Sequence, residues 1–142
     1  MKFPVSYIKS IMIMSGLLTC TMFYAAVAPR EALQSTFGDN LGAGPLAEIL
    51  VQNWGVLVTL VGGALIYGAY DPGARTLALL VATTSKLGFV TLVLSLGPSY
   101  LGQQAGIAVV VDTLWVAVFA WYLAATPSDA RIELVPPGTA RS

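Results

Sequence analysis

The chain has 142 residues, of which 56% are hydrophobic and only 10% are charged. A soluble domain has about 25% charged residues, so this composition predicts an integral membrane protein of one modest domain. Seven basic and seven acidic residues cancel, which provides no basic face for nucleic acid.

The residue types exclude several kinds of chemistry. The chain has no histidine and a single cysteine, Cys20, so zinc sites built from His and Cys, Ser-His-Asp hydrolysis and CxxC redox exchange cannot form. We therefore expect no metal and no cofactor. Cys20 lies in an apolar run, and we interpret it as a small buried hydrophobic residue.

Four apolar stretches are each long enough to cross the hydrocarbon core as a helix, which takes about 20 residues. They cover roughly residues 8–28, 47–70, 75–97 and 104–125. Short turns join the last three stretches, so neighbouring helices run antiparallel. The predicted fold is all-α, an antiparallel bundle of four transmembrane helices over residues 1–126, followed by a disordered cytoplasmic tail over 127–142.

The first stretch also has features of a signal peptide. Lys2 and Lys9 precede it, and AVA near its end resembles a cleavage site. However, Pro29 would follow the cut, and the apolar run is longer than the roughly 7–15 residues of a typical signal core. We interpret the stretch as a retained span, with a cleaved signal as the alternative.

The connection after the first span is the longest of the three. Proline is favoured at the first position of a helix, so Pro29 predicts a short interfacial helix with Leu33 and Phe37 on one face. A flexible glycine-rich segment follows, and Pro45 opens the second span.

Lysine and arginine at the span ends or beyond them indicate the orientation in the membrane. The side that holds the termini carries Lys2, Lys9, Arg75, Arg131 and Arg141. The other side carries only Arg30. This asymmetry predicts a multi-pass protein of the bacterial inner membrane with both termini in the cytoplasm.

Small residues on the second span predict close helix packing. Gly55, Thr59 and Gly63 follow one another at four-residue spacing, with Gly62 beside them, and fall on one stripe of the helix. Because lipid provides no hydrophobic drive for helix association, such stripes let two backbones approach closely. We therefore expect the second span to be central in the bundle.

Lys86 and Asp112 are the charged residues deep inside the spans, away from their ends. A charge at the bilayer centre costs about 2.5–3.5 kcal/mol on insertion scales, so it normally faces the bundle interior and finds a partner. At 1.5 Å per residue, Lys86 lies ~16 Å from the end of its span and Asp112 ~12 Å from the same end of the next. The sequence predicts that the two pair.

Further polar side chains lie towards that end of the spans. Asn53 falls ~10 Å into the second span, close to the level of the pair. Glu48, Gln52, Gln103 and Gln104 lie nearer the rim. Together they predict a small polar cavity that opens away from the termini, with Lys86 and Asp112 at its floor.

The pair has three interpretations. It could only fix which helix faces meet, as buried polar pairs do in some proteins. It could bind a ligand or carry a proton, or its true counter-charge could come from a partner protein.

The first span closes in AAVAPREAL, the second opens with QNWG, and the fourth holds the carboxylate of Asp112. The chain resembles the small bacterial membrane proteins grouped as DoxX-like in these features, in its size and in its four spans. The resemblance covers roughly residues 7–125. It implies a four-span membrane layout and assigns no functional residues.

The size, the lack of a nucleophile–base pair and the small-residue stripes favour an accessory or scaffold protein that binds a lipid-like molecule or another membrane protein. Its expected partners are membrane lipid, another membrane protein or a second copy. Two alternatives stay open. One is a transporter of a small solute or proton through Lys86 and Asp112. The other is a membrane enzyme with Asp112 as acid or base on an apolar substrate.

Overall fold

The computed structural model describes residues 5–40, 42 and 44–126, so the predicted tail over 127–142 lies outside the described residues. The described chain is helical, as the sequence predicts. Its elements are α1 (Val5–Cys20), α2 (Phe23–Val27), α3 (Pro29–Phe37), α4 (Pro45–Tyr70), α5 (Pro72–Leu96), the 3₁₀ helix η1 (Pro98–Gly102) and α6 (Gln104–Ala125).

Four segments are long and apolar enough to cross a membrane: Tyr7–Val27, which joins α1 and α2, and the helices α4, α5 and α6. These segments indicate a multi-pass membrane protein and confirm the predicted all-α bundle. The second span begins at Pro45, the proline predicted to open it, and the third begins at Pro72, slightly before the predicted residue 75. Proline is well suited to the first helical position because the amide proton it lacks would be unpaired there anyway.

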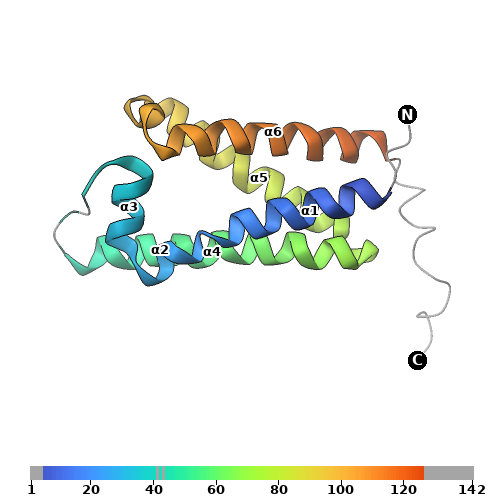
Figure 1. Ribbon diagram of the computed structural model, residues 1–142, viewed down its shortest axis with the longest axis horizontal. Helices are drawn as coiled ribbons and strands as arrows, with labels where there is room; N and C mark the ends of the chain where they lie inside the picture. The colour runs from blue at the N-terminus through green and yellow to red at the C-terminus, as the bar shows by residue number, and fades with distance from the viewer. Residues whose placement is uncertain (1–4, 41, 43, 127–142) are drawn as a thin grey trace.

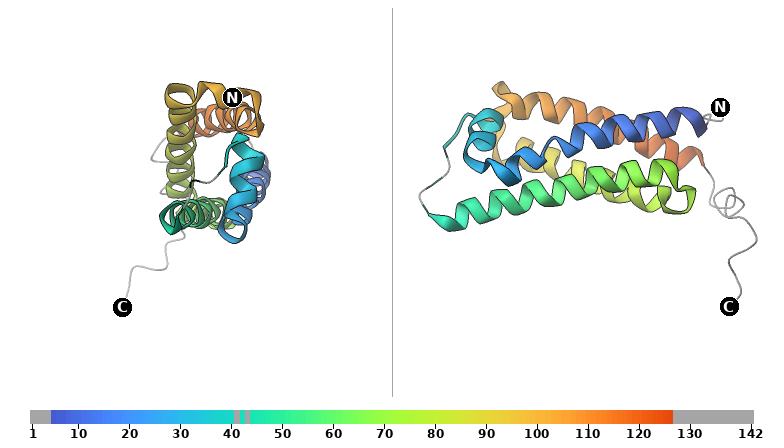
Figure 2. Two further views of the ribbon diagram at one scale, coloured as in Figure 1. Left: turned by 90° about the vertical axis from the view of Figure 1, so that its left-hand side faces the viewer. Right: turned by 60° about the horizontal axis from the view of Figure 1, so that its bottom comes forward.

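The spans pack in the order α1, α4, α5, α6 around the bundle (Figure 1). Viewed end-on, they lie at the corners of a four-sided arrangement (Figure 2, left). We call the end where α1 begins and α6 ends the terminal end. The opposite end, where α3 and η1 lie, is the distal end.

The first span is interrupted between α1 and α2. The amides of Thr21 and Met22 donate to the carbonyls of Leu18 and Thr19, three residues back, at 3.2 and 3.1 Å. This tighter 3₁₀ spacing breaks the regular helix at Thr21 and Met22. After α2, the predicted interfacial helix is present as α3, which begins at Pro29 and ends before Gly38 in the left-handed conformation.

The turn between α4 and α5 is held by two side chains. Asp71 accepts a hydrogen bond from the amide of Gly73 at 2.8 Å and so caps the start of α5. Arg75 is buried and donates to the carbonyls of Gly68 and Ala69, both at 3.2 Å. These carbonyls lie at the end of α4 and have no partner within the helix. The guanidinium of Arg75 therefore caps α4 and links it to α5.

The largest group of buried apolar residues lies in the terminal half, and all four spans contribute to it. Its members are Ile8, Met12, Leu65, Ala69, Ala78, Leu79, Ala82, Phe119 and Tyr122. We call this cluster the terminal core.

Close packing between α1 and α4 depends on two glycines. A Cβ atom on Gly62 would lie 2.7 Å from the carbonyl oxygen of Gly16, and one on Gly16 would lie 2.8 Å from that of Gly62. At Gly55 a Cβ would meet the backbone of α2. Thr59 lies beside this contact, and its carbonyl accepts a hydrogen bond from the Cys20 thiol at 3.7 Å.

The prediction for Gly63 was wrong. It is exposed, and a Cβ there would have no neighbour within 4 Å. Gly55 and Gly62 are seven residues apart, close to two full turns, so they share a face. Gly63 is rotated from Gly62 by one residue and points out of the bundle.

Gly62 and Gly63 form a matched pair for mutation. We expect Gly62→Ala to destabilise the bundle by about 1–3 kcal/mol, because the added methyl would overlap the backbone of α1. Gly63→Ala should change stability by less than about 0.5 kcal/mol. Thermal unfolding of both variants in the same detergent measures this, and equal effects would contradict the packing described.

Asp71 should make the stability of the fold decrease at acid pH. The hydrogen bond from Tyr67 and those from the Gly73 and Ala74 amides lower the pKa of the Asp71 carboxyl. A lowered pKa stabilises the fold above the usual aspartate pKa, and this contribution is lost as pH falls through the folded-state value. Asp71→Asn should lower the melting temperature at pH 7 and not in strong acid. A difference that stays constant with pH would contradict this.

Candidate functional site

The predicted pairing of Lys86 with Asp112 is confirmed. Nζ of Lys86 lies 2.5 Å from Oδ1 of Asp112, and the two side chains are only 8% and 19% exposed. Lys86 lies near the middle of α5, and Asp112 lies on the neighbouring antiparallel helix α6. The pair therefore links two spans within the bundle.

The third helix that contributes to this polar site is α1. The hydroxyl of Thr19 accepts a hydrogen bond from Nζ of Lys86 at 3.3 Å and donates to the carbonyl of Ser15 at 2.7 Å. Thr19 therefore links α1 to the charged pair through one oxygen. Ser15 and Thr19 are four residues apart and share a face of the first span, but this spacing alone does not indicate that the face meets Lys86.

Asn53 is not part of this site. It is exposed on α4, so the prediction that it joins the layer of Lys86 and Asp112 was wrong. Depth along the helix was the only criterion for that prediction, and depth does not determine the face. Gly55 faces α2, and a step of two residues rotates a helix by about 200°, which turns Asn53 outwards.

The predicted polar rim is dispersed at the surface. Glu48 forms an exposed ion pair with Arg30, with its Oε1 2.6 Å from the guanidinium. Gln52, Gln103 and Gln104 are exposed. The Glu48–Arg30 pair fastens the start of α3 to the start of α4 but does not enclose a polar space.

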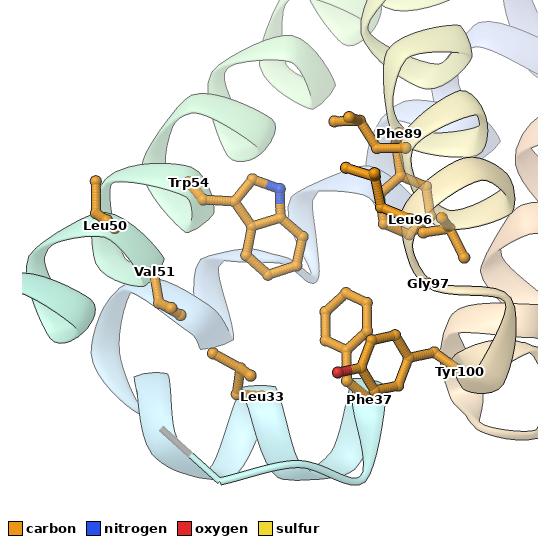
Figure 3. Close-up of a pocket in the computed structure, with 11 residues that line it drawn as sticks. Leu33, Phe37, Leu50, Val51, Trp54, Phe89, Leu96, Gly97 and Tyr100 are labelled. Carbon is orange, nitrogen blue, oxygen red and sulfur yellow. The ribbon is translucent and has the colours of Figure 1, made fainter. Parts of the chain in front are cut away.

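A separate cavity of about 420 Å³ lies in the distal half (Figure 3). Its lining comes from α3, α4, α5 and the chain that follows α5. The lining residues are Leu33, Phe37, Leu50, Val51, Trp54, Phe89, Leu92, Val93, Leu96, Gly97 and Tyr100. None of them is charged, and none was predicted as a site residue.

The path of α5 explains this cavity. It starts beside the end of α4 at the Asp71 turn and diverges from α4 towards the distal end (Figure 1). The short helix α3 covers the resulting gap. Its Phe37 ring lies 5.3 Å from the Tyr100 ring and 6.4 Å from the Trp54 ring, and these distances are typical of aromatic pairs.

Tyr100 also holds the connection between α3 and α4. Its hydroxyl donates a hydrogen bond to Oδ2 of Asp39 at 3.0 Å. This hydrogen bond and the negative charge of Asp39 raise the pKa of Tyr100, so the phenol stays protonated and remains a donor.

The predicted polar cavity with the ion pair at its floor was therefore wrong. The cavity is apolar, and Lys86 and Asp112 are absent from its lining. Phe89, one turn beyond Lys86 on α5, is the cavity residue closest to the pair along that helix. The molecule thus has two adjacent but distinct features, a polar layer in its middle and an apolar cavity in its distal half.

The polar layer has a limited chemical repertoire. Its hydrogen-bonded side chains provide one ammonium, one carboxylate and one hydroxyl. Within the described part of the chain, no group of three His, Cys, Asp or Glu residues could hold a metal ion. The fold and the two features define a multi-pass helical membrane protein with a buried ion pair. Comparisons of the chain with protein-family models, curated proteins and solved structures find no significant match.

A double-mutant cycle tests the ion pair. Lys86→Met and Asp112→Leu should each destabilise the bundle by about 3–5 kcal/mol, because each leaves an unpaired buried charge. The double variant should recover at least about 1 kcal/mol of the summed loss. Unfolding in detergent provides the measurement.

The exposed pair Arg30–Glu48 is the matched control for this cycle. Its coupling should stay below about 1 kcal/mol, because solvent screens it. If the single variants at Lys86 and Asp112 unfold like the wild type, the pair does not stabilise the bundle.

Proposed function

We propose that this protein binds the apolar chain of a lipid-like molecule in the distal cavity, as an accessory protein of the bacterial inner membrane. The observation that supports the proposal is the cavity itself. Its volume of about 420 Å³ lies in the range of small-molecule sites, which measure roughly 300–1,000 Å³. Its apolar and aromatic lining suits a hydrocarbon chain.

The mouth of the cavity supports access from the membrane. Leu50, Leu92 and Leu96 line it and are also between 57% and 80% exposed. They belong to membrane-spanning helices, so their exposed faces contact hydrocarbon. A lipid chain could therefore enter sideways between α4 and α5 without crossing water.

The orientation of a bound chain follows from the position of the lining residues. Phe89 marks the inner end of the cavity near mid-helix, and Leu33 of α3 and Tyr100 mark its distal end. A chain with its tip near Phe89 would place its polar head at the level of α3. Exposed polar groups such as the Arg30–Glu48 pair lie at that end of the bundle.

The arrangement provides less support for transport through Lys86 and Asp112. The terminal core lies on one side of the pair, and the apolar cavity lies on the other. The cytoplasmic location of the termini and the DoxX-like resemblance stay predictions. The arginine and lysine distribution supports the first, and the span layout supports the second.

Trp54 lines the cavity and can report binding. In a variant that keeps Trp54 and carries Trp115→Phe and Trp121→Phe, we expect dibrominated stearic acid to quench the fluorescence saturably in detergent. Phosphatidylcholine with the same brominated chain forms a second arm. The arm with the lower half-quenching concentration distinguishes a free fatty acid from a phospholipid.

Cavity filling provides the control. Val51→Phe places a ring in the cavity and should raise the half-quenching concentration about tenfold, equivalent to roughly 1.4 kcal/mol. Val56 lies on the exposed face of the same helix, so Val56→Phe should leave the half-quenching concentration unchanged. Quenching that does not saturate, or that Val51→Phe leaves unaltered, would contradict binding in the cavity.

A further inference from the structure

Three buried polar atoms in the described structure have no hydrogen-bond partner: Oγ of Ser15, Oγ1 of Thr83 and Nε1 of Trp115. They come from α1, α5 and α6, the same three helices that supply Thr19, Lys86 and Asp112. Ser15 is 0% exposed. Buried polar groups are nearly always paired with protein or with ordered water.

The helix register brings these atoms to one level. Ser15 precedes Thr19 by four residues, and Thr83 precedes Lys86 by three. Trp115 follows Asp112 by three residues on a helix that runs the opposite way. Residues three or four apart share a helix face, so each atom lies about one turn, or roughly 5 Å, from the ion pair towards the terminal end.

The unpaired hydroxyls differ from several other hydroxyls in the spans. Thr59, Thr113 and Ser95 each donate to a carbonyl of their own helix four residues back, as helical hydroxyls commonly do. Ser15 and Thr83 make no such bond. Their oxygen atoms remain available to a ligand in the bundle interior.

Lys86 has a donor to spare in the same region. A lysine ammonium has three donors, and Lys86 uses two of them, on Asp112 and Thr19. The described helix pairs with extended contacts include α1 with α4 and α5 with α6, but not α1 with α6. The layer around the pair is therefore bordered by two helices that do not pack closely together.

We propose that α1, α5 and α6 bind water in this layer, between Ser15, Thr83, Trp115 and the ion pair. A buried water typically makes about three hydrogen bonds, so one or two molecules could satisfy these atoms and the third donor of Lys86. The indole of Trp115 can only donate, and a water oxygen can accept from it. The bound water stabilises both charges inside the membrane.

This water is internal and does not form part of a channel. The terminal core lies beyond Ser15 and Thr83, with Met12 and Leu79 fully buried in it. The apolar cavity lies on the other side of the ion pair. The inference is independent of the proposed lipid binding, because the two sites share no residue.

The sign of a stability change tests the proposal. Ser15→Ala and Thr83→Val remove the hydroxyls at nearly constant shape. If water binds there, each variant loses its hydrogen bonds and should melt a few degrees below the wild type. If the layer is dry, each variant removes an unsatisfied polar group, and the melting temperature should stay constant or rise, which would overturn the proposal.

Two matched variants control for the loss of a hydroxyl as such. Ser95→Ala and Thr113→Val remove hydroxyls that bond to their own helix, and both residues are exposed. They should melt close to the wild type. If their melting temperatures fall as much as those of Ser15→Ala and Thr83→Val, the effect is not specific to the polar layer, and the proposal fails.

Trp115 provides a second measurement that does not depend on stability. Ultraviolet resonance Raman spectroscopy of a variant with Trp54→Phe and Trp121→Phe reports whether the Trp115 indole N–H is hydrogen-bonded. We expect a bonded N–H that exchanges in D₂O and weakens in Ser15→Ala. A free N–H, or a bonded one that Ser15→Ala and Thr83→Val both leave unchanged, would overturn the proposal.

Discussion

The ion pair between Lys86 and Asp112 is the constraint on which the arrangement of the bundle depends. Neither charge can face lipid at low cost, because an ionised group loses its hydration there. Each must therefore turn inwards and find the other, which sets the rotation of α5 and of α6 about their axes. Thr19 adds α1 to the same point, so three of the four spans meet at one polar layer.

This layer divides the bundle into two halves of different character. On the terminal side, Arg75 and Asp71 hold α4 and α5 together at a tight turn, and all four spans contribute buried residues to the apolar core. On the distal side, α5 runs towards α6 and leaves α4, and α3 with Phe37 covers the gap incompletely. The cavity is a consequence of this divergence, since side chains of ordinary size do not fill the space between separating helices.

The sequence predicted the depth of a residue along its helix better than the face of the helix on which it lies. Counting residues from the span ends correctly placed Lys86 level with Asp112, because the rise per residue is nearly constant in a helix. The same count placed Asn53 nearby, although it faces outwards. Gly62 and Gly63 show the same limit, since adjacent glycines differ by about 100° in direction and only Gly62 meets α1. The rotation of each helix about its own axis depends on the neighbouring helices, so it cannot be derived from a single sequence.

The sequence by itself determined the four apolar spans, the short helix that begins at Pro29 and the pairing of two intramembrane charges. These follow from local chemistry: span length, proline geometry and the cost of an unpaired charge in lipid. Only the tertiary structure decided that the cavity is apolar, that Thr19 completes the polar layer and that Ser15, Thr83 and Trp115 lie unpaired beside it. Those features depend on how far two helices diverge and which faces meet, and both result from packing among all the spans at once.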